Sequence, residues 1–334
     1  MAGIKLNLRN GIRVKDKSRE FGAIKGKGTD GTPFTWQIPV LITVDASLGQ
    51  TVDLYLGLFQ TDLRIDWGDG TVENVVSAGS DVYHTYPSPS STYQIHITGV
   101  NLTGRFSVNV NTASNSQNNV VSIDNYYYGG KDVVSECEST SLLSLPNYLP
   151  VTVRSLRYIM RFSTANVTGP ENWDTSNLTL CFDAFRDASG FNRDISSWDV
   201  SKVTLMTNMF NGASSFNQDI SSWNVSGVTS MGSMFEGASS FNQDLSSWDI
   251  SNVSNMFKMF DGSGLSTENY SRILIGWANA HFAGNARDDV FLGASGITYN
   301  NTAYTTGNQF NDAVSARSYL VNTAGWTITD GGQV

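Results

Sequence analysis

A 25-residue repeat constrains the fold of this chain more than any other feature of its sequence. One complete unit, FNQDISSWNVSGVTSMGSMFEGASS, runs from Phe216 to Ser240, and closely similar units begin at Phe191 and Phe241. Because a unit of this length cannot bury its own apolar face, it must stack on its neighbours. The period therefore predicts five stacked coils with one continuous core.

Columns of large apolar side chains should form this core. We expect the tryptophans to point inward beside Val225, although flat rings in an exposed row would instead suit the faces of sugars. Cys181 lies in the methionine column, so it is expected to be a buried thiol, as is Cys137. Two cysteines are too few for a disulfide framework and leave the redox compartment open. The predicted core residues are Trp173, Trp198, Trp223, Trp248, Met206, Met231, Met256, Phe210, Phe235 and Phe260.

The spacing within one unit predicts a strand followed by a short helix. From Ile220 to Val228 the apolar residues follow i, i+3, i+5, i+8, close to the leucine-rich repeat pattern, whose middle part is a strand. From Val228 to Phe235 they follow i, i+3, i+6, i+7, which is one stripe of a helix. The sequence EGAS that follows supplies a turn.

The units resemble those of a known family. The pattern FNQDISSWDVSNVTSM..MF.GASS is similar to the BspA-type leucine-rich repeats of bacterial surface proteins, over about residues 120–265. Two later stretches, GLSTENYSRILIGWA and SARSYLVNTAGWTITDGG, resemble the segment that ends chains of that family. The resemblance implies an α/β leucine-rich-repeat solenoid over residues 101–264 with a C-terminal cap over residues 265–334.

Residues 36–100 show a different pattern, of short alternating strands separated by turn residues, which predicts a short β-sandwich. The string IDWGDGT...HTYPSPSSTYQIHITG resembles a PKD-type immunoglobulin-like domain and implies a spacer or adhesion module without catalysis. Asp69 and Gly70 mark a tight hairpin turn. Asp66 and Asp69 could bind Ca²⁺, but the lack of further carboxylates favours the turn. The expected fold class is therefore mixed, with a sandwich followed by the solenoid.

Charge is unevenly distributed along the chain. Residues 1–27 contain eight Lys and Arg against Asp16 and Glu20, a net charge of +6, which leaves −15 of the total of −9 for residues 28–334. We interpret residues 1–35 as a basic arm that docks on an acidic assembly, a solvated tail being the alternative. The acidic remainder argues against nucleic acid as a partner. No apolar run has the length of a signal peptide or a membrane span.

Candidate catalytic and metal-binding residues are few. His84, His96 and His281 lack the spacing of metal ligands and have no neighbouring nucleophile in the sequence. Two further columns, of asparagine and aspartate, are expected to satisfy loop backbone groups rather than bind metal. We expect no enzyme and no cofactor apart from a possible Ca²⁺. The columns are Asn192, Asn217 and Asn242, and Asp194, Asp219 and Asp244.

If the tryptophans point inward, alternation sends small polar residues outward onto the predicted sheet. Their hydroxyls and carboxylates could hydrogen-bond a saccharide, with Ca²⁺ as a bridge, or could simply be solvated. We call this surface the polar face. Its residues are Ser197, Asp199, Ser201, Ser222, Asn224, Ser226, Ser247, Asp249 and Ser251.

These features favour a non-enzymatic structural or binding protein. The basic arm and the absence of a signal peptide favour a virion protein of a tailed phage, as a head decoration, fibre or tail receptor-binding component at the virion surface. The alternative is a BspA-like adhesin on the bacterial surface or outside the cell; an enzyme acting on polysaccharide and a scaffold are further alternatives. Expected partners are other assembly proteins through the arm, a host glycan or protein, and further copies of the chain in a homo-oligomer.

Overall fold

The structure is a computed structural model of the 334-residue chain. The chain divides into two compact units, Met1–Gln37 and Ile38–Val334. In the first, β1 (Lys25–Lys27) pairs antiparallel with β2 (Pro33–Thr35); most of the predicted basic arm lies outside the described residues, as does Cys137. The structure describes residues 25–27, 33–35, 40–45, 51–56, 63–75, 80–87, 92–99, 106–107, 120–125, 144–149, 153–304 and 307–334.

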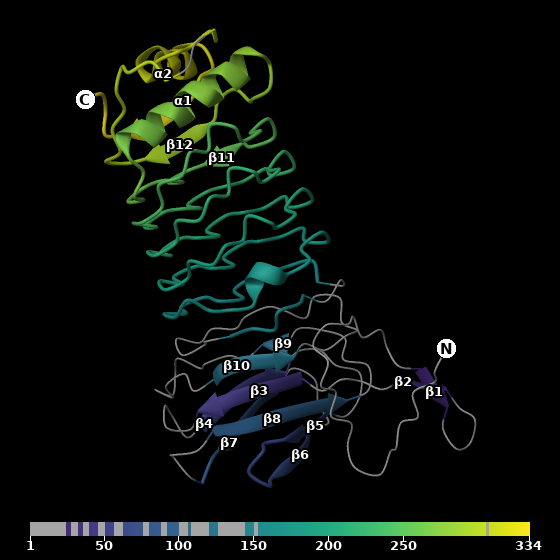
Figure 1. The fold of residues 1–334 in the computed structure, drawn as a ribbon. Coiled ribbons are helices and arrows are strands. Elements are labelled where there is room, and N and C mark those ends of the chain that lie inside the picture. Colours follow the sequence, from purple (N-terminus) through teal and green to yellow (C-terminus); the bar gives the residue numbers. More distant parts are fainter. Residues whose placement is uncertain are drawn as a thin grey trace, which may run out of the picture. The chain divides into compact units, whose positions relative to one another are not determined.

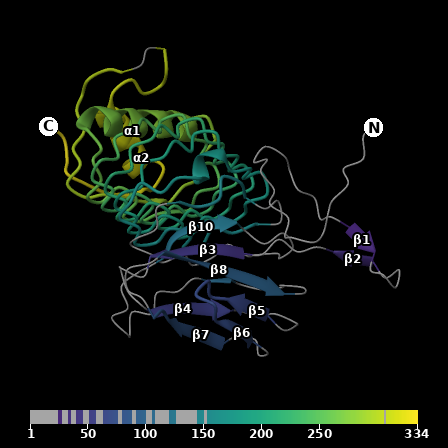
Figure 2. The same ribbon diagram turned by 60° about the horizontal axis from the view of Figure 1, so that its bottom comes forward.

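The N-terminal part of the second unit forms two antiparallel sheets (Figure 2). A five-stranded sheet has the order β10, β3, β8, β5, β6, and a three-stranded sheet has the order β7, β4, β9. The sheets take in strands as far as Asn125, beyond residue 100, where the sequence pattern ended this domain. The strands are β3 (Val40–Asp45), β4 (Thr51–Leu56), β5 (Leu63–Asp66), β6 (Val72–Val75), β7 (Ser80–Thr85), β8 (Thr92–Gly99), β9 (Phe106–Ser107) and β10 (Val120–Asn125).

The repeat units lie one upon another as a stack of turns (Figure 1). Isolated parallel bridges join the same position of successive units, and backbone hydrogen bonds connect each unit to the next along the same stretch. The bridges run through Ser155, Leu180, Leu205, Ser230 and Asn255. We call residues 153–264 the repeat stack.

Two consecutive four-residue turns form the bridged part of each unit. Met209 donates its N–H to the Met206 carbonyl at 3.1 Å, and Ala213 donates to Phe210 at 3.0 Å. The third residues of the two turns, Asn208 and Gly212, have φ of 55° and 69°, as type II turns require. Between these bonds, alternate N–H groups reach the next unit; that of Phe210, for example, donates to the Met234 carbonyl at 2.9 Å.

The expected fold class is therefore wrong. Among the described residues only two segments are α-helical, α1 (Thr267–Phe282) and α2 (Ala313–Asn322), and both follow the repeats. Inside the repeat stack the structure shows turns, isolated bridges, one single-turn 3₁₀ helix (Pro170–Asn172) and, in the last unit, a two-residue strand (Asn255–Met256), not the strand and helix of a leucine-rich repeat in every unit. A residue with positive φ in every turn cannot continue a right-handed helix, and the hydrogen bonds close i to i+3 rather than i to i+4. The sheets are small.

The C-terminal region continues the stack with regular elements. A parallel sheet has the order β11 (Asn255–Met256), β12 (Phe291–Ala294), β13 (Thr327–Asp330). Helices α1 (Thr267–Phe282) and α2 (Ala313–Asn322) pack together and begin at side-chain caps. Ser266 Oγ accepts the N–H of Asn269, and Asp312 accepts that of Ser315.

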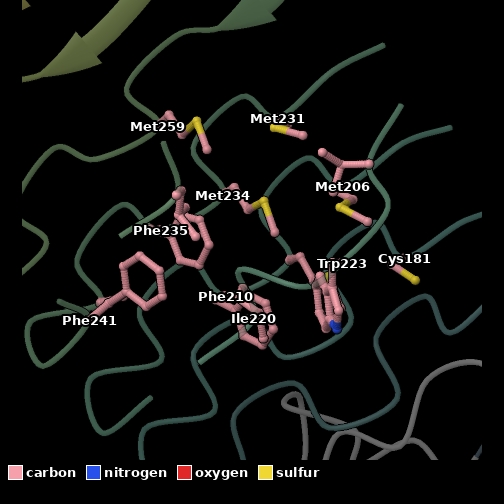
Figure 3. Packing of buried hydrophobic residues seen from close by; sticks show 14 of the residues in the cluster. Cys181, Met206, Phe210, Ile220, Trp223, Met231, Met234, Phe235, Phe241 and Met259 are labelled. Atoms are coloured by element: carbon pink, nitrogen blue, oxygen red, sulfur yellow. The ribbon is translucent and has the colours of Figure 1, made fainter. Parts of the chain in front are cut away.

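The core of the repeat stack consists of side-chain columns (Figure 3). All ten predicted core residues are buried, and Cys181, Met206 and Met231 follow one another from unit to unit. Rings stack in parallel, with centroids 5.3 Å apart for Phe185 and Phe210. The Cys181 thiol is free, and burial raises its pKa to about 12.

The tryptophan column also carries a hydrogen-bond ladder. Trp223 Nε1 donates to the Ile195 carbonyl at 3.1 Å, and Trp248 makes the equivalent bond one unit later. Trp277, on α1, donates in the same way to Leu245 at 3.2 Å. Each indole is thus buried with its one polar atom satisfied, so this column offers no exposed platform for a sugar.

Candidate binding surfaces of the repeat stack

The asparagine column is structural. Asn217 donates its N–H to Asn192 Oδ1 at 3.0 Å, and Asn242 donates to Asn217 Oδ1 at 2.9 Å. The ladder ends on the C-terminal region, where Ser266 donates to Asn242 Oδ1 and Asn269 Nδ2 donates to the Asn242 carbonyl, both at 2.9 Å. The aspartate column differs, because each carboxylate accepts a hydrogen bond from its own unit; Ser221, for example, donates to Asp219 at 2.9 Å.

The predicted polar face is exposed, but its residues also close local turns. In each triplet the first two side chains are exposed and the third is half-buried. The N–H and the hydroxyl of Ser201 donate to Asp199 Oδ1 at 3.0 and 2.6 Å, and Ser226 does the same to Asn224 at 3.2 and 2.7 Å. Such Asx turns explain why the triplet repeats without any ligand. That this face binds a saccharide stays a prediction.

A second surface of the repeat stack was not predicted. It consists of one side of the paired four-residue turns, where all positions except Asp183 and Gly232 are at least partly exposed. We call this surface the turn face. Side-chain contacts join its columns, since Thr207 Oγ1 lies 3.0 Å from Ser230 Oγ, and Lys258 Nζ lies 3.1 Å from Glu236 Oε1. Its members are residues 155, 157, 158, 161 and 162 and their equivalents at intervals of 25 in the next four units.

Exposed apolar side chains gather on the turn face. Among the described residues, seven large hydrophobic side chains are exposed, and four of them lie here. Phe162 and Leu180 are each 36% exposed, Leu205 is 37% exposed and Phe257 is 48% exposed. The other three are Val72, Phe282 and Val334, which lie outside the repeat stack. Of the four, Leu180 and Leu205 are neighbours, since a parallel bridge joins them, and adjacent exposed apolar residues mark interaction sites more often than isolated ones do.

Arginines cover aromatic rings at the N-terminal end of the turn face. The Arg157 guanidinium carbon lies 4.5 Å from the Tyr158 ring centroid and 5.5 Å from that of Phe182. The corresponding carbon of Arg161 lies 5.0 Å from Tyr158 and 4.5 Å from Phe162. These cation–π contacts order long side chains before any partner arrives, which lowers the entropic cost of binding.

Acidic and basic groups of the same face pair with one another. Arg186 lies 3.3 Å from the buried Asp183 and 3.5 Å from Asp187. Glu236 receives Lys258 at 3.1 Å and the Asn211 amide at 3.2 Å. The side chains of Arg186, Glu236 and Lys258 each stay about a third or more exposed, so these pairs remain open to further contacts.

One signal in the sequence could have found the turn face. Columns that hold the fold together repeat almost unchanged, as the tryptophan and asparagine columns do. Columns of the turn face change from unit to unit; one of them contains Arg157, Phe182, Thr207, Gly232 and Phe257 in turn. In a chain of near-identical units, the positions whose residue type differs from unit to unit are the ones that stacking does not require.

The WGDG motif of the antiparallel sheets forms a closed turn. Asp69 Oδ1 accepts the N–H and the hydroxyl of Thr71 at 2.9 and 2.6 Å, and Oδ2 lies 2.8 Å from His84 Nε2. Burial acts to raise the pKa of Asp69, but the hydrogen bonds of Thr71 and His84 outweigh it and lower the pKa to about 2. Gly68, at φ 81°, is required because a Cβ there would lie 2.4 Å from the Gln94 carbonyl oxygen. Both Asp69 oxygens are engaged within the protein, which favours the turn over Ca²⁺.

The remaining histidines have structural surroundings. His281, at the end of α1, lies 3.0 Å from the Tyr319 hydroxyl and 2.8 Å from Asp288, while His96 is exposed on β8. Within the part of the chain that the structure describes, no three His, Cys, Asp or Glu side chains are placed to hold a metal ion. None of the helices described is long and apolar enough to span a membrane.

Comparison with known proteins gives one result. Residues 155–273 match a family described as Mycoplasma protein of unknown function, DUF285. The match covers the repeats that resemble BspA-type surface proteins and is consistent with that resemblance; it gives no support to a PKD domain or a phage origin. No curated protein and no solved structure matches this chain.

Proposed function

We propose that this chain is a non-enzymatic binding protein displayed on a bacterial surface and that the turn face makes the contact with its partner. The observation that carries the proposal is the coincidence of two properties on one surface. Four of the seven exposed large hydrophobic residues among those described lie there, and the same columns differ from unit to unit. No other described surface of the repeat stack combines them.

The composition of the turn face favours a protein partner. Arginine and aromatic residues are enriched at the energetic centres of protein interfaces, and Arg157, Tyr158 and Phe182 are already held in contact. Exposed leucines beside them, Leu180 and Leu205, need an apolar counterpart, which a polar glycan does not offer. The polar face, with its small turn-closing side chains, has no such anchor.

The bacterial setting is supported by the family match and by the resemblance to BspA-type surface proteins. The phage role put first from the sequence depends on the basic arm, and residues 1–24 lie outside the described part of the chain. No observation of the structure favours that role, so we propose the cell surface as the place of display.

The proposal can be tested with fluorescent beads that carry the purified chain. Beads with the wild-type chain are counted on a cultured epithelial cell layer and on a printed glycan array. The double variant Arg157→Ala, Phe182→Ala should lower binding to the cells by about tenfold or more, because interface anchors dominate affinity.

The matched control is Ser222→Ala with Asn224→Ala on the polar face, which should bind like the wild type. Binding lost through the polar-face variant and kept in the turn-face variant would show that the contact surface is the one predicted from the sequence. Wild-type beads that bind the glycan array but not the cells would contradict a protein partner.

A further inference from the structure

One column of the turn face has a charge gradient along the repeat stack. From the first unit to the fifth it contains Arg161, Arg186, Asn211, Glu236 and Asp261. Two positive side chains are followed by a neutral amide and then by two negative ones. The charges therefore reverse sign about Asn211. Because Arg186 and Glu236 already pair within the chain with Asp183, Asp187 and Lys258, the electrostatic complementarity of the reversed column lies mainly in its two ends, Arg161 and Asp261.

Side-chain size follows the same symmetry. Phe162 lies two units before the middle unit, and the equivalent position two units after it is Gly262. In a neighbouring column Phe182 precedes the middle unit by one, and Gly232 follows it by one. Each of these two rings therefore corresponds to a glycine, a residue without a side chain, on the other half of the face.

The outermost positions add a third correspondence. Arg157 in the first unit corresponds to Phe257 in the fifth, and Phe257 is 48% exposed. Tyr158 corresponds in the same way to Lys258. A cation opposite an aromatic ring is a favourable pair in both cases.

A two-fold axis brings these correspondences into contact. If it lies in the plane of the turn face, perpendicular to the stacking direction, and passes through the middle unit, each column meets the same column of a second copy in reverse order. Because the units repeat at an even spacing, all five units then stay in register. The residues of the middle unit, among them Leu205 and Asn211, face their own copies.

We propose that the turn face pairs with the turn face of a second copy of this chain, antiparallel and centred on the unit that contains Asn211. This inference rests on the proposed role of the turn face as a recognition surface and adds a second copy of the chain to the partners that this face binds. Five units about 4.8 Å apart give a face about 24 Å tall, at the small end of specific interfaces. We therefore expect a concentration-dependent dimer rather than a permanent one.

Charge reversal on the two ends of the column gives a sharp test, by sedimentation velocity at up to about 500 μM, a range suited to a small interface. Arg161→Glu places two negative groups opposite each other at both ends of the dimer, and Asp261→Lys places two positive groups there. Each variant alone should dimerise about tenfold more weakly than the wild type, or worse. An equimolar mixture of the two should associate more tightly than either alone, because every contact in the mixed dimer again joins opposite charges.

Two further variants test whether the dimer forms through the turn face. Leu205→Arg puts two cations together at the axis and should abolish the dimer, whereas Lys202→Glu, an exposed charge reversal outside the turn face, should leave it intact. Thermal unfolding of every variant shows whether it is folded. Asp261→Lys also loses the hydrogen bonds from Ser295, and if that loss alone weakened the dimer, mixing with Arg161→Glu would not restore association.

The inference is overturned if the wild-type chain stays monomeric over the whole range, or if dimers form that neither charge reversal weakens. The bead assay separates this failure from that of the proposed function. If the wild-type chain is monomeric but the Arg157→Ala, Phe182→Ala variant still loses cell binding, the proposed function stands and self-pairing is wrong. If the dimer depends on Arg161 and Asp261 but the turn-face variant binds cells normally, self-pairing stands and the proposed function is wrong.

Discussion

The repeat stack and helix α1 bury their side chains with the same spacing and have different backbones. One unit of the stack buries the side chains at positions 231, 234, 235 and 238, and α1 buries those at 270, 273, 274 and 277 in addition to Ser271, Ile275 and Ala278. Both sets follow i, i+3, i+4, i+7. A four-residue turn points its first and last residues inward, so two such turns in succession reproduce the pattern of an α-helix.

Other features of the two segments separate them. The stretch in the stack is only eight residues long and places Ser233 and Gly237 at φ of 53° and 72°. Helix α1 runs for 16 residues from a serine cap, and Tyr270 donates its N–H to the Ser266 carbonyl four residues earlier at 3.0 Å. The comparison teaches that apolar spacing identifies the buried side of a short segment but not its backbone; length and the residues at special φ identify the backbone.

The largest expected effect tests whether α1 acts energetically as one more unit of the stack. Trp223→Ala and Trp277→Ala each remove a buried indole that donates to a carbonyl of the preceding unit. Each should lower the free energy of unfolding by about 3–5 kcal/mol, measured by urea denaturation followed by circular dichroism.

A much smaller loss for Trp277→Ala would mean that α1 is a loosely attached appendage, and the comparison between the two segments would then fail. Val334, exposed at the C-terminus, gives a control, because Val334→Ala should leave stability unchanged.

Glycine substitutions should act with opposite signs in the two segments. Ser233→Gly replaces a residue held in the left-handed region and should raise stability by about 0.5–1 kcal/mol. Ala280→Gly in α1 removes a good helix former and should lower stability by about 0.5–1 kcal/mol. Thermal unfolding of the two variants beside the wild type measures both. If both substitutions destabilise to the same degree, the positive φ at Ser233 is not the costly conformation that it is here taken to be.

The smallest effect concerns acid. Hydrogen bonds from the Ser201 hydroxyl and N–H lower the pKa of Asp199 in a turn of the stack, and the N–H of Ser315 lowers that of Asp312 at the cap of α2. A carboxyl group with a lowered pKa stabilises the fold above its unfolded pKa near 3.9, and this contribution is lost as pH falls through the lower folded value.

Asp199→Asn should therefore leave the free energy of unfolding unchanged at pH 7, since Asn224 closes the same turn one unit later. Between about pH 4 and pH 2 the variant should lose less stability than the wild type, by a few tenths of a kcal/mol because solvent screens the carboxylate. Asp312→Asn should behave alike. Urea denaturation at the two ends of that range measures the difference, and an Asp199→Asn variant that is less stable at pH 7 would show that charge, not the turn, matters there.

The period of the sequence identified which residues repeat their contacts, but not the fold class. Contacts at intervals of 25 residues and the buried columns depend only on which side chains are apolar. The helix predicted between Val228 and Phe235 was wrong because turn and helix share one spacing over eight residues. The strands β9 and β10 lie in the segment that the sequence assigned to the repeats.

The candidate site was missed for a related reason. The triplets of the polar face attracted attention because they repeat, yet Ser201 and Ser226 repeat because each closes an Asx turn. Arg157 and Phe182 interrupt their column and were passed over. Whether two arginines contact one ring depends on the direction in which each turn points its side chains. The spacing of apolar residues does not predict that direction.

The way the stack ends on α1 has a consequence for how such a gene can change. Ser266, Asn269 and Trp277 make the same bonds to the last unit that a further unit would make. Recombination between the nearly identical coding copies would therefore add or delete whole units without requiring a new junction. An extra unit would move the centre of the charge gradient away from Asn211, so chains of unequal length would match each other poorly. Copy number alone could then sort related cells by the partners they recognise.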